Sequence, residues 1–386
     1  MIRRRIFEEE HDIFRASVRK WVAEHIEPHA ARWRDQGVVD RDVWTAAGEA
    51  GFLAMFVEEK YGGLALDDFR YDQILIEEIH RIDSSFYLGL HNRIVAPYLH
   101  NFGTEDQKAR FLPGVTAGTC ILAIAMTEPG TGSDLAAVRT RAEERDDHWV
   151  LNGSKTYISN GQLADLVIVA ARTDPSSSHG VGLFLLERGM AGFERGQNLK
   201  KLGLEGQDTS ELFFQDVKVP KNNVLGDPRG GFKTMMVNLA EERLGGAIQF
   251  VTRAERALEI TRDFVMERKA FGQPIGLFQN SRFKLAALRT ELDAAWAFVD
   301  HCVLDHLQGE LSADLAAEAK LFTSEVEGRV VDECLQLHGG AGYMDEYEIT
   351  RHYRDARVSR IYAGTSEIMK EIIGRSMGLD DRKAKR

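Results

Sequence analysis

A glycine-rich turn at residues 125–134 (Ala-Met-Thr-Glu-Pro-Gly-Thr-Gly-Ser-Asp) has the residue types that bind a phosphate group. It follows an apolar run at residues 121–124 that predicts a strand. Glycines let backbone N–H groups approach an anion closely, and Ser and Thr hydroxyls add further donors. The turn therefore predicts a site for a phosphate-bearing cofactor, although it matches neither the GxGxxG fingerprint nor the P-loop. Taken alone, a glycine-rich turn after a strand is more often an ordinary turn.

The segment before this turn is predicted to be helical. Apolar side chains recur every four residues from Phe14 to Ile26, which places them on one helix face, and Pro28 should end that helix. Residues 104–107 (Thr-Glu-Asp-Gln) form a capping box that begins another helix. We expect Pro113 to stop it.

The segment from about residue 120 to 230 changes to the two-residue period of strands. Residues 138–143 alternate in polarity, and Asn152-Gly153 predicts a tight turn between two strands. Further short strands are predicted at residues 166–170, 181–186 and 211–214.

The helical period returns after Gly230-Gly231, with helices over about 278–307 and 312–338. The order of elements predicts an α+β fold of three domains. These are an N-terminal α-helical domain (1–120), a middle β-barrel or sandwich domain (121–230) and a C-terminal four-helix bundle (231–386).

Composition excludes several classes of function. The net charge of −11 argues against nucleic acid as a main partner. Three widely spaced cysteines argue against a disulfide or a metal site and fit a reducing cytoplasm. No signal peptide is recognisable, and no apolar stretch reaches the roughly 20 residues that span a bilayer. We therefore expect a cytoplasmic protein with no metal and no membrane partner.

Four more segments, together with the first turn, carry further information about function. They are residues 155–161 (Lys-Thr-Tyr-Ile-Ser-Asn-Gly), 267–272 (Glu-Arg-Lys-Ala-Phe-Gly), 336–342 (Gln-Leu-His-Gly-Gly-Ala-Gly) and 361–368 (Ile-Tyr-Ala-Gly-Thr-Ser-Glu-Ile). With the helix–sheet–helix order, these five motifs resemble those of acyl-CoA dehydrogenases, in the family's order and spacing. The resemblance covers nearly the whole chain and is greatest to the long-chain and isovaleryl-type branch.

This resemblance implies an oxidoreductase that acts on CH–CH bonds. It implies that FAD takes a hydride at its N5 while an acyl-CoA becomes a trans-2-enoyl-CoA, and that an electron-transfer flavoprotein takes the electrons, as in fatty acid β-oxidation. It also implies a homotetramer in which neighbouring subunits complete each flavin site.

The motifs assign cofactor contacts by match. One set is Ile124, Met126, Thr127, Gly132, Ser133, Tyr157, Ile158, Ser159, Thr365 and Glu367. Another, which the match places against the FAD of an adjacent subunit, is Arg268, Phe271, Gln279, Gln336, Leu337, Gly339 and Gly340. Tyr157 replaces the family's commoner Trp but keeps a flat ring that can stack. Singly, Arg268 could be a surface charge and Gly339-Gly340 a helix stop, so only the joint pattern indicates a flavin site.

The catalytic base is not where many relatives have it. Their glutamate lies in a Tyr-Glu-Gly-Thr segment, and this chain has Ala363 at that position. The long-chain and isovaleryl-type branches instead place a glutamate just before an arginine, which matches Glu242 and Arg243 here. We therefore predict Glu242 as the base. Glu241 lies about 100° around the helix, so we expect only one of the two carboxylates to face the substrate.

The substrate contacts follow from the same match and are Ser133, Arg243, Ala363 and Gly364. The backbone N–H of Ala363 would polarise the thioester oxygen, a function that survives the loss of the glutamate side chain. The small Ala363 favours a medium-to-long or branched acyl group. Arg243 could otherwise serve only in an ion pair with a neighbour.

Other functions remain open from the sequence. They are an oxidase that passes electrons to oxygen, a flavin-dependent monooxygenase on the same scaffold, and a non-catalytic subunit of a mixed tetramer. Glu242 and Arg268 argue against the monooxygenase, and the intact flavin segments argue against the silent subunit.

Overall fold

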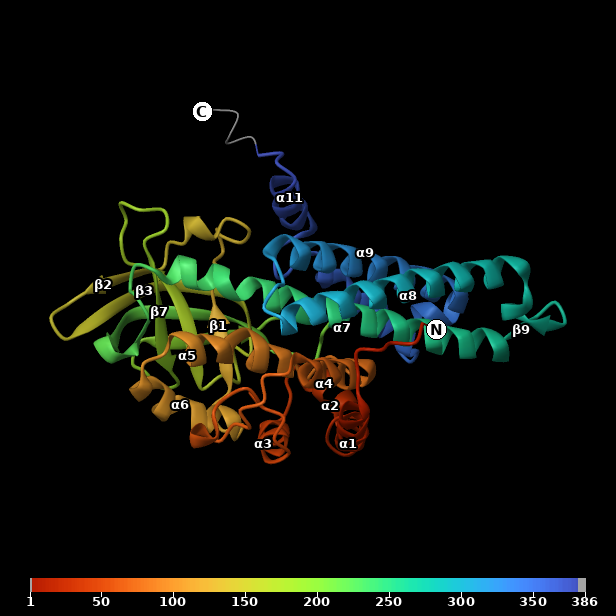
Figure 1. Ribbon diagram of the computed structural model, residues 1–386, viewed down its shortest axis with the longest axis horizontal. Coiled ribbons are helices and arrows are strands. Elements are labelled where there is room, and N and C mark those ends of the chain that lie inside the picture. The colour runs from red at the N-terminus through yellow and green to blue at the C-terminus, as the bar shows by residue number, and fades with distance from the viewer. Residues whose placement is uncertain (1, 381–386) are drawn as a thin grey trace.

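The computed structural model describes residues 2–380. Figure 1 shows a β-sheet at one end of the molecule, long helices that extend to the other end, and the N-terminal helices along one side of both. The predicted order of helices, sheet and helices is confirmed.

The N-terminal segment consists of short and medium helices. They are α1 (Glu9–His25), α2 (Ala30–Gln36), α3 (Asp42–Glu49), η1 (Glu59–Tyr61), α4 (Phe69–Ile82), the π-helix η2 (Leu90–Val95), α5 (Ala96–Phe102) and α6 (Glu105–Thr116). The capping box of α6 is present, because Thr104 and Gln107 exchange two side chain–backbone hydrogen bonds of 3.0 and 3.2 Å. The prediction that Pro113 stops α6 is wrong. The helix continues to Thr116, whose hydroxyl donates to the Leu112 carbonyl at 3.1 Å.

The middle of the chain forms one eight-stranded mixed sheet. Its strands are β1 (Leu122–Ala125), β2 (Arg141–Glu144), β3 (His148–Ser159), β4 (Leu166–Arg172), β5 (Val181–Glu187), β6 (Phe193–Asn198), β7 (Thr209–Pro220) and β8 (Val224–Leu225). The order is β6-β7-β3-β2-β4-β5-β8, and β1 pairs in parallel with β4. The 3-10 helices η3 (Leu135–Ala137) and η4 (Lys221–Asn223) lie between strands.

The predicted turn at Asn152-Gly153 is wrong, because both residues lie within the continuous strand β3. The register between β3 and β7 shifts there instead, so the pair marks a β-bulge. Gly153 has a φ of 146°, and a Cβ on it would lie 2.6 Å from the Thr140 hydroxyl. Asn152 exchanges two hydrogen bonds with Asp216 of β7, which holds the bulge in place.

Strand β2 is shorter than the alternation at residues 138–143 predicts. It begins only at Arg141, because the preceding backbone is bound elsewhere. The amides of Arg139 and Thr140 donate to the Glu128 carboxylate at 2.7 and 2.8 Å rather than to a neighbouring strand. The glycine-rich turn thus competes with the sheet for this segment.

The C-terminal segment is dominated by three helices that pack side by side (Figure 1). The elements are α7 (Gly231–Glu267), β9 (Lys269–Ala270), β10 (Gln273–Pro274), η5 (Ile275–Leu277), α8 (Gln279–Leu307), α9 (Ala313–His338), η6 (Gly339–Tyr343), α10 (Glu348–Ala356), η7 (Arg357–Arg360) and α11 (Ser366–Ser376). The expected end of α9 before Gly339 is confirmed.

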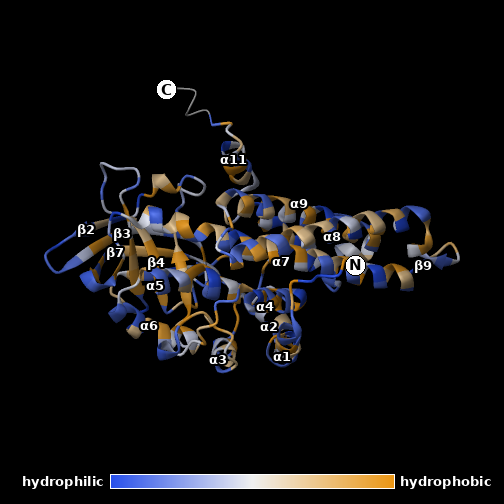
Figure 2. Cartoon of the chain, in the orientation of Figure 1, coloured by the Kyte–Doolittle hydropathy of each residue, from blue (hydrophilic) through white to orange (hydrophobic). Residues whose placement is uncertain are grey.

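Apolar residues are frequent in the strands of the sheet and alternate with polar ones along the long helices (Figure 2). One buried cluster lies between the sheet and the helices η2, α5 and α6, and Met235 near the start of α7 belongs to it. Ile124 of β1 and Met126 of the glycine-rich turn pack against the same cluster. The turn and the first part of α7 therefore share one core.

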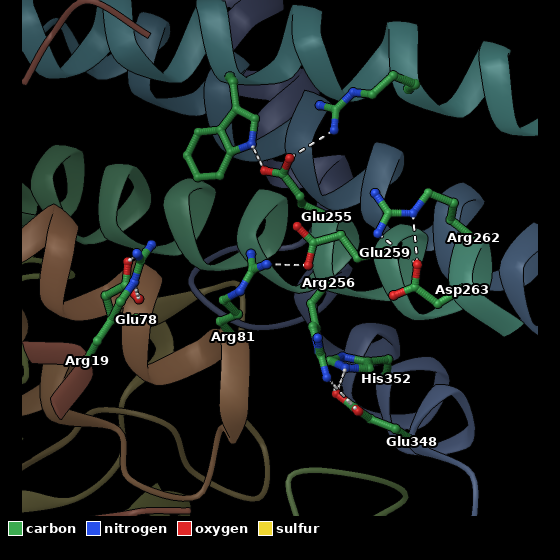
Figure 3. A network of polar contacts seen from close by, with 12 residues as sticks. Arg19, Glu78, Arg81, Glu255, Arg256, Glu259, Arg262, Asp263, Glu348 and His352 are labelled. Atoms are coloured by element: carbon green, nitrogen blue, oxygen red, sulfur yellow. Dashed lines mark hydrogen bonds and ion pairs between the residues drawn. The ribbon is translucent and has the colours of Figure 1, made fainter. Parts of the chain in front are cut away.

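Ion pairs join the N-terminal helix α4 to α7, and α7 to α10, as Figure 3 shows. Arg81 of α4 pairs with Glu259 of α7, and Arg256 of α7 pairs with Glu348 of α10 at 3.0 Å. Glu348 also bonds His352 at 3.1 Å. The Arg81–Glu259 pair holds α4 against α7, the helix that carries Glu242. In residues 2–380, no helix is long and apolar enough to cross a bilayer.

Candidate active site

Glu242 lies on α7, half-buried, and lines a small cavity between α4, η2 and α7. Burial raises the pKa of Glu242 to about 7, and the positive charges of Arg243 and Lys320 limit that rise. Within residues 2–380, no hydrogen bond or ion pair holds its carboxylate. A carboxylate with these properties can accept a proton at neutral pH, because its pKa is close to the working pH.

Glu241 lines the same cavity, one residue before Glu242 on α7. The two differ in their partners. Glu241 pairs with Arg93 at 3.4 Å and approaches His306 at 3.6 Å. Burial raises its pKa to about 7 as well, against the opposing charge of Arg93. Arg93 is itself held by the buried Asp72 at 2.7 Å, which makes Glu241 part of a structural ion-pair network.

The walls of the cavity are mostly apolar. Ile76 of α4, Gly89 and Ile94 line it, together with Gly245 of α7 and the half-buried Tyr87. The π-helix η2 supplies Ile94, and π-helical turns occur frequently at functional sites. Gly245 lies three residues after Glu242 on α7, and a Cβ on it would meet only Ile76, at 3.8 Å. The glycine leaves room beside the carboxylate.

The loop at residues 361–365 adjoins this region through the polar groups around Glu242. Ala363 has a φ of 53° and Gly364 a φ of 88°, both in the left-handed region. In the described part of the chain, the Ala363 N–H has no hydrogen-bond acceptor. Arg243 is buried, and its Nε likewise has no hydrogen-bond partner there. Unpaired buried donors of this kind fit a ligand that supplies acceptors.

A buried ion pair anchors the glycine-rich turn. Lys155 of β3 donates to the Glu128 carboxylate and to the Met126 carbonyl, each at 2.9 Å. Burial lowers the pKa of Lys155 to about 8, while Glu128 opposes that shift. The Thr156 amide donates to the Thr127 carbonyl at 3.0 Å. The turn and β3 are thus held together, although the sequence analysis assigned no role to Glu128 or Lys155.

The predicted cofactor residues of β3 lie beside that turn. Tyr157 sits in a β-bulge with a φ of 60°, and its side chain is 69% exposed. Bulges re-aim side chains, and here a flat ring faces outward next to the turn. At Gly132 a Cβ would meet nothing within 4 Å, so the space in front of the turn is open. An exposed ring, hydroxyls on Thr127 and Ser133, and open glycine backbone fit a flavin with its phosphates.

The second predicted set lies at the other end of α7. Arg268 caps α7, Phe271 is at the tip of the β9–β10 hairpin, and Gln279 begins α8. His338, near the end of α9, stacks on Phe264 of α7 at 4.2 Å, so residues 336–340 belong to the same end. Figure 1 places this hairpin at the end of the bundle that points away from the sheet. The structure therefore divides the predicted cofactor residues into two separated groups.

Some polar residues around Glu242 were not foreseen from the sequence. They include Tyr87, Gln249 and Lys320, which reach the site from the segment before η2, from α7 and from α9. The one signal that could have indicated Lys320 is its place in the helical register, since Ala316, Ala317 and Thr323 lie three or four residues away on the same face.

Three family models match successive parts of the chain. They describe the N-terminal, middle and C-terminal domains of acyl-CoA dehydrogenases and match residues 8–119, 123–217 and 229–378. The long-chain specific acyl-CoA dehydrogenase of Mus musculus is 47% identical over 98% of this chain and 88% of its own length. The isovaleryl-CoA dehydrogenase of Oryza sativa is 37% identical over 96% and 92%, respectively.

Solved structures agree. The acyl-CoA dehydrogenase of Geobacillus kaustophilus has a TM-score of 0.96 and 46% identity, with 97% of this chain and 100% of that one covered. A glutaryl-CoA dehydrogenase of Mycobacterium smegmatis in complex with FADH2 has a TM-score of 0.91 at 28% identity, over 97% and 96%. The chain belongs to the acyl-CoA dehydrogenase family, whose cofactor is FAD. The resemblance, the fold class and the cofactor expected from the sequence are thereby confirmed.

Proposed function

We propose that this chain oxidises the α–β bond of a medium-to-long or branched acyl-CoA to a trans-2-enoyl-CoA, with Glu242 as the base. The observation that supports this is the half-buried, unpaired carboxylate of Glu242, whose pKa of about 7 suits proton removal at neutral pH. FAD, when bound, accepts the hydride from the β carbon.

The chain's own residues have three tasks in this proposal. Glu242 takes the α-proton. The free N–H of Ala363 donates to the thioester oxygen, where negative charge develops as the proton leaves. Arg243, buried with an unpaired Nε, holds part of the CoA moiety. Ser133 and Gly364 complete the substrate contacts.

The proposed flavin contacts form the two groups described above. Thr127, Ser133, Tyr157 and Ser159 would hold the cofactor of the same chain. Arg268, Phe271, Gln279 and residues 336–340 would hold the cofactor of a neighbouring subunit in a homotetramer. The guanidinium of Arg268 is exposed and has no partner in residues 2–380, which suits the pyrophosphate of another chain.

The acyl chain would pass between α4 and α7, along the apolar cavity at Gly245. The space left by Gly245 supports a long or branched tail rather than a short one. We further propose that the electrons pass to an electron-transfer flavoprotein in β-oxidation. The cytoplasmic location stays a prediction, since the relatives include mitochondrial enzymes.

The test is Glu242→Gln, with Glu241→Gln as the matched control. We expect Glu242→Gln to lower kcat by about 10²–10⁴-fold with FAD still bound, because a general base contributes about that much. Glu241→Gln removes a carboxylate that pairs with Arg93, and it should retain most of the activity. Equal losses in the two variants, or near-normal activity of Glu242→Gln, would refute the role of Glu242.

The assay uses a panel of straight and branched acyl-CoAs, followed by flavin bleaching without oxygen. A panel in which short straight chains react fastest would refute the substrate class. Hydrogen peroxide formation without an added acceptor would show an oxidase instead.

A further inference from the structure

Lys320 of α9 is a fully buried lysine next to the candidate active site. Its Nζ donates to the Gly364 carbonyl at 2.7 Å. Burying an ammonium group costs free energy unless the group is paired and hydrogen-bonded, so the position calls for a physical explanation. Lys320 holds the loop that carries Ala363.

That loop is held in an unusual conformation. Ala363 and Gly364 both have positive φ, and a Cβ on Gly364 would lie 2.6 Å from Cε of Met369. A non-glycine residue in the left-handed region is strained and persists only where its surroundings hold it. On the far side, the Thr365 hydroxyl caps α11 by accepting from the Ile368 amide at 3.3 Å. Lys320 binds the carbonyl of Gly364, which is the peptide group that joins the strained residues to Thr365.

The charged groups that face Lys320 belong to two elements. Glu242 and Arg243 lie on α7, and Glu367 lies on α11. Burial and Arg243 lower the pKa of Lys320 to about 8, while Glu367 and Glu242 oppose that shift, so the lysine is still mostly protonated at pH 7. Its charge in turn lowers the pKa of Glu242. One side chain therefore touches the loop and acts electrostatically on the base.

We propose that Lys320 is a positioning residue for the reaction: it binds the Gly364 carbonyl and so directs the Ala363 N–H at the thioester oxygen, opposite Glu242. The proposal rests on the proposed function. In the step concerned, Glu242 takes the α-proton and the electron pair of the C–H bond moves onto the thioester oxygen, where the Ala363 N–H donates. Returning a proton from Glu242 to the α carbon reverses the step.

This step can be measured apart from oxidation. A 3-thiaacyl-CoA has sulfur in place of the β carbon, so proton removal can occur but hydride transfer cannot. In D2O the holoenzyme exchanges the α-hydrogens of this analogue for deuterium, and NMR follows the rate. We would compare wild type with Lys320→Met, Lys320→Arg and Lys201→Met. Lys201 is a matched control because its Nζ donates to the Gln207 carbonyl at 2.5 Å, in a different loop.

We expect Lys320→Met to slow exchange by about 10–100-fold, since misplacing a catalytic group by about 1 Å costs a similar factor. Lys320→Arg keeps the positive charge, but the larger guanidinium does not match the position of the ammonium group at the Gly364 carbonyl. This variant should slow exchange less than Lys320→Met. Lys201→Met should exchange as wild type does. FAD content and far-UV circular dichroism of each variant report whether it is folded.

The pH profile of kcat/KM separates positioning from a purely structural role. Without the charge of Lys320, the pKa of Glu242 rises, so the acidic limb of the Lys320→Met profile should move to higher pH. The limb of Lys320→Arg should stay in place. Wild-type exchange in folded Lys320→Met, or an unmoved limb, would overturn the inference. If Glu242→Gln exchanges as fast as wild type in the same assay, the proposed function has failed instead.

Discussion

The two ends of α7 differ in how complete they are within one chain. Near its first half, Glu242 lies among α4, η2 and α9, with a pKa already raised to about 7. At its last turn, Arg268 is exposed without a partner among the described residues, and Phe271 beside it is 96% exposed. The first end is prepared by the fold of the single chain. The second end presents exposed side chains that would make contacts only with a ligand or another chain.

The base and the residues at the distal end of α7 therefore need different things from their surroundings. The base needs a particular electrostatic environment, which burial within one chain supplies. The distal groups need a ligand or a surface, because a large exposed aromatic side chain has little stabilising contact of its own. We therefore interpret the distal end as the part of the flavin site that serves another subunit.

The largest expected effect comes from mixing two variant subunits. It tests directly whether the two ends of α7 belong to the flavin sites of different chains. Glu242→Gln and Arg268→Gln should each be nearly inactive alone. When the two are co-expressed, some sites combine Glu242 of one chain with Arg268 of the other, and random pairing restores roughly a quarter of the sites. Activity of the purified mixture, with each variant separately tagged, is the measurement. If the two residues serve the same chain's site, mixing restores nothing.

Removing one partner of the buried pair at the glycine-rich turn should strongly destabilise the protein. Lys155→Met leaves the buried Glu128 carboxylate without its counter-charge, with two backbone amides still donating to it, and breaking such a pair costs about 3–5 kcal/mol. We expect a lower midpoint of urea unfolding and loss of FAD on gel filtration. The exposed pair of Lys60 and Glu105, 3.1 Å apart, is the control. Lys60→Met should leave the midpoint of urea unfolding nearly unchanged, because water and salt screen an exposed ion pair. Equal effects of the two variants would contradict the role of the buried pair.

The raised pKa of Glu242 predicts opposite effects of pH on activity and stability. Activity needs the carboxylate, so kcat/KM should rise with pH through about 7. The folded-state pKa lies above the unfolded value near 4.5, so the folded state binds the proton more tightly, and ionisation of Glu242 destabilises the fold as pH rises from 4.5 through 7. Glu242→Gln should therefore raise Tm relative to wild type at pH 8 but not at pH 4.5, as calorimetry of both proteins would show. A Tm difference independent of pH would contradict this.

The smallest expected effect concerns the cavity beside Glu242, at the first end of α7. Gly245→Val adds methyl groups to the cavity beside Glu242. The new Cβ would lie 3.8 Å from Ile76, and the two methyl groups would extend beyond it. We expect kcat/KM for long or branched acyl-CoAs to fall by roughly 10–200-fold, since a methylene in an apolar pocket is worth about that much, and to fall less for short ones. Gly374 of α11, whose Cβ would meet nothing within 4 Å, is the control for valine in a helix. A uniform loss for all substrates would contradict a role in chain selection.

Much of the architecture could be predicted from local sequence. The capping box at Thr104 and the end of α9 at Gly339 are confirmed, because caps and glycine stops act within one helical turn. The two local predictions that failed, a turn at Asn152-Gly153 and a stop at Pro113, failed through tertiary contacts. Asn152 is held by Asp216 of another strand, and the segment after Pro113 is held by the Tyr61 carbonyl, which accepts from Thr116 at 2.9 Å.

The sequence by itself determined the order of helices and strands, the family and the residue types available for chemistry. Glu242 is the example: the absence of a glutamate at Ala363 and the match at Arg243 indicated it before any contact was known. Only the tertiary structure decided what surrounds that carboxylate. Glu241 is its neighbour in the chain and lines the same cavity, yet Arg93 pairs with Glu241 and not with Glu242. A pKa depends on burial and on charges brought together from distant segments, and such distances exist only once the chain has folded.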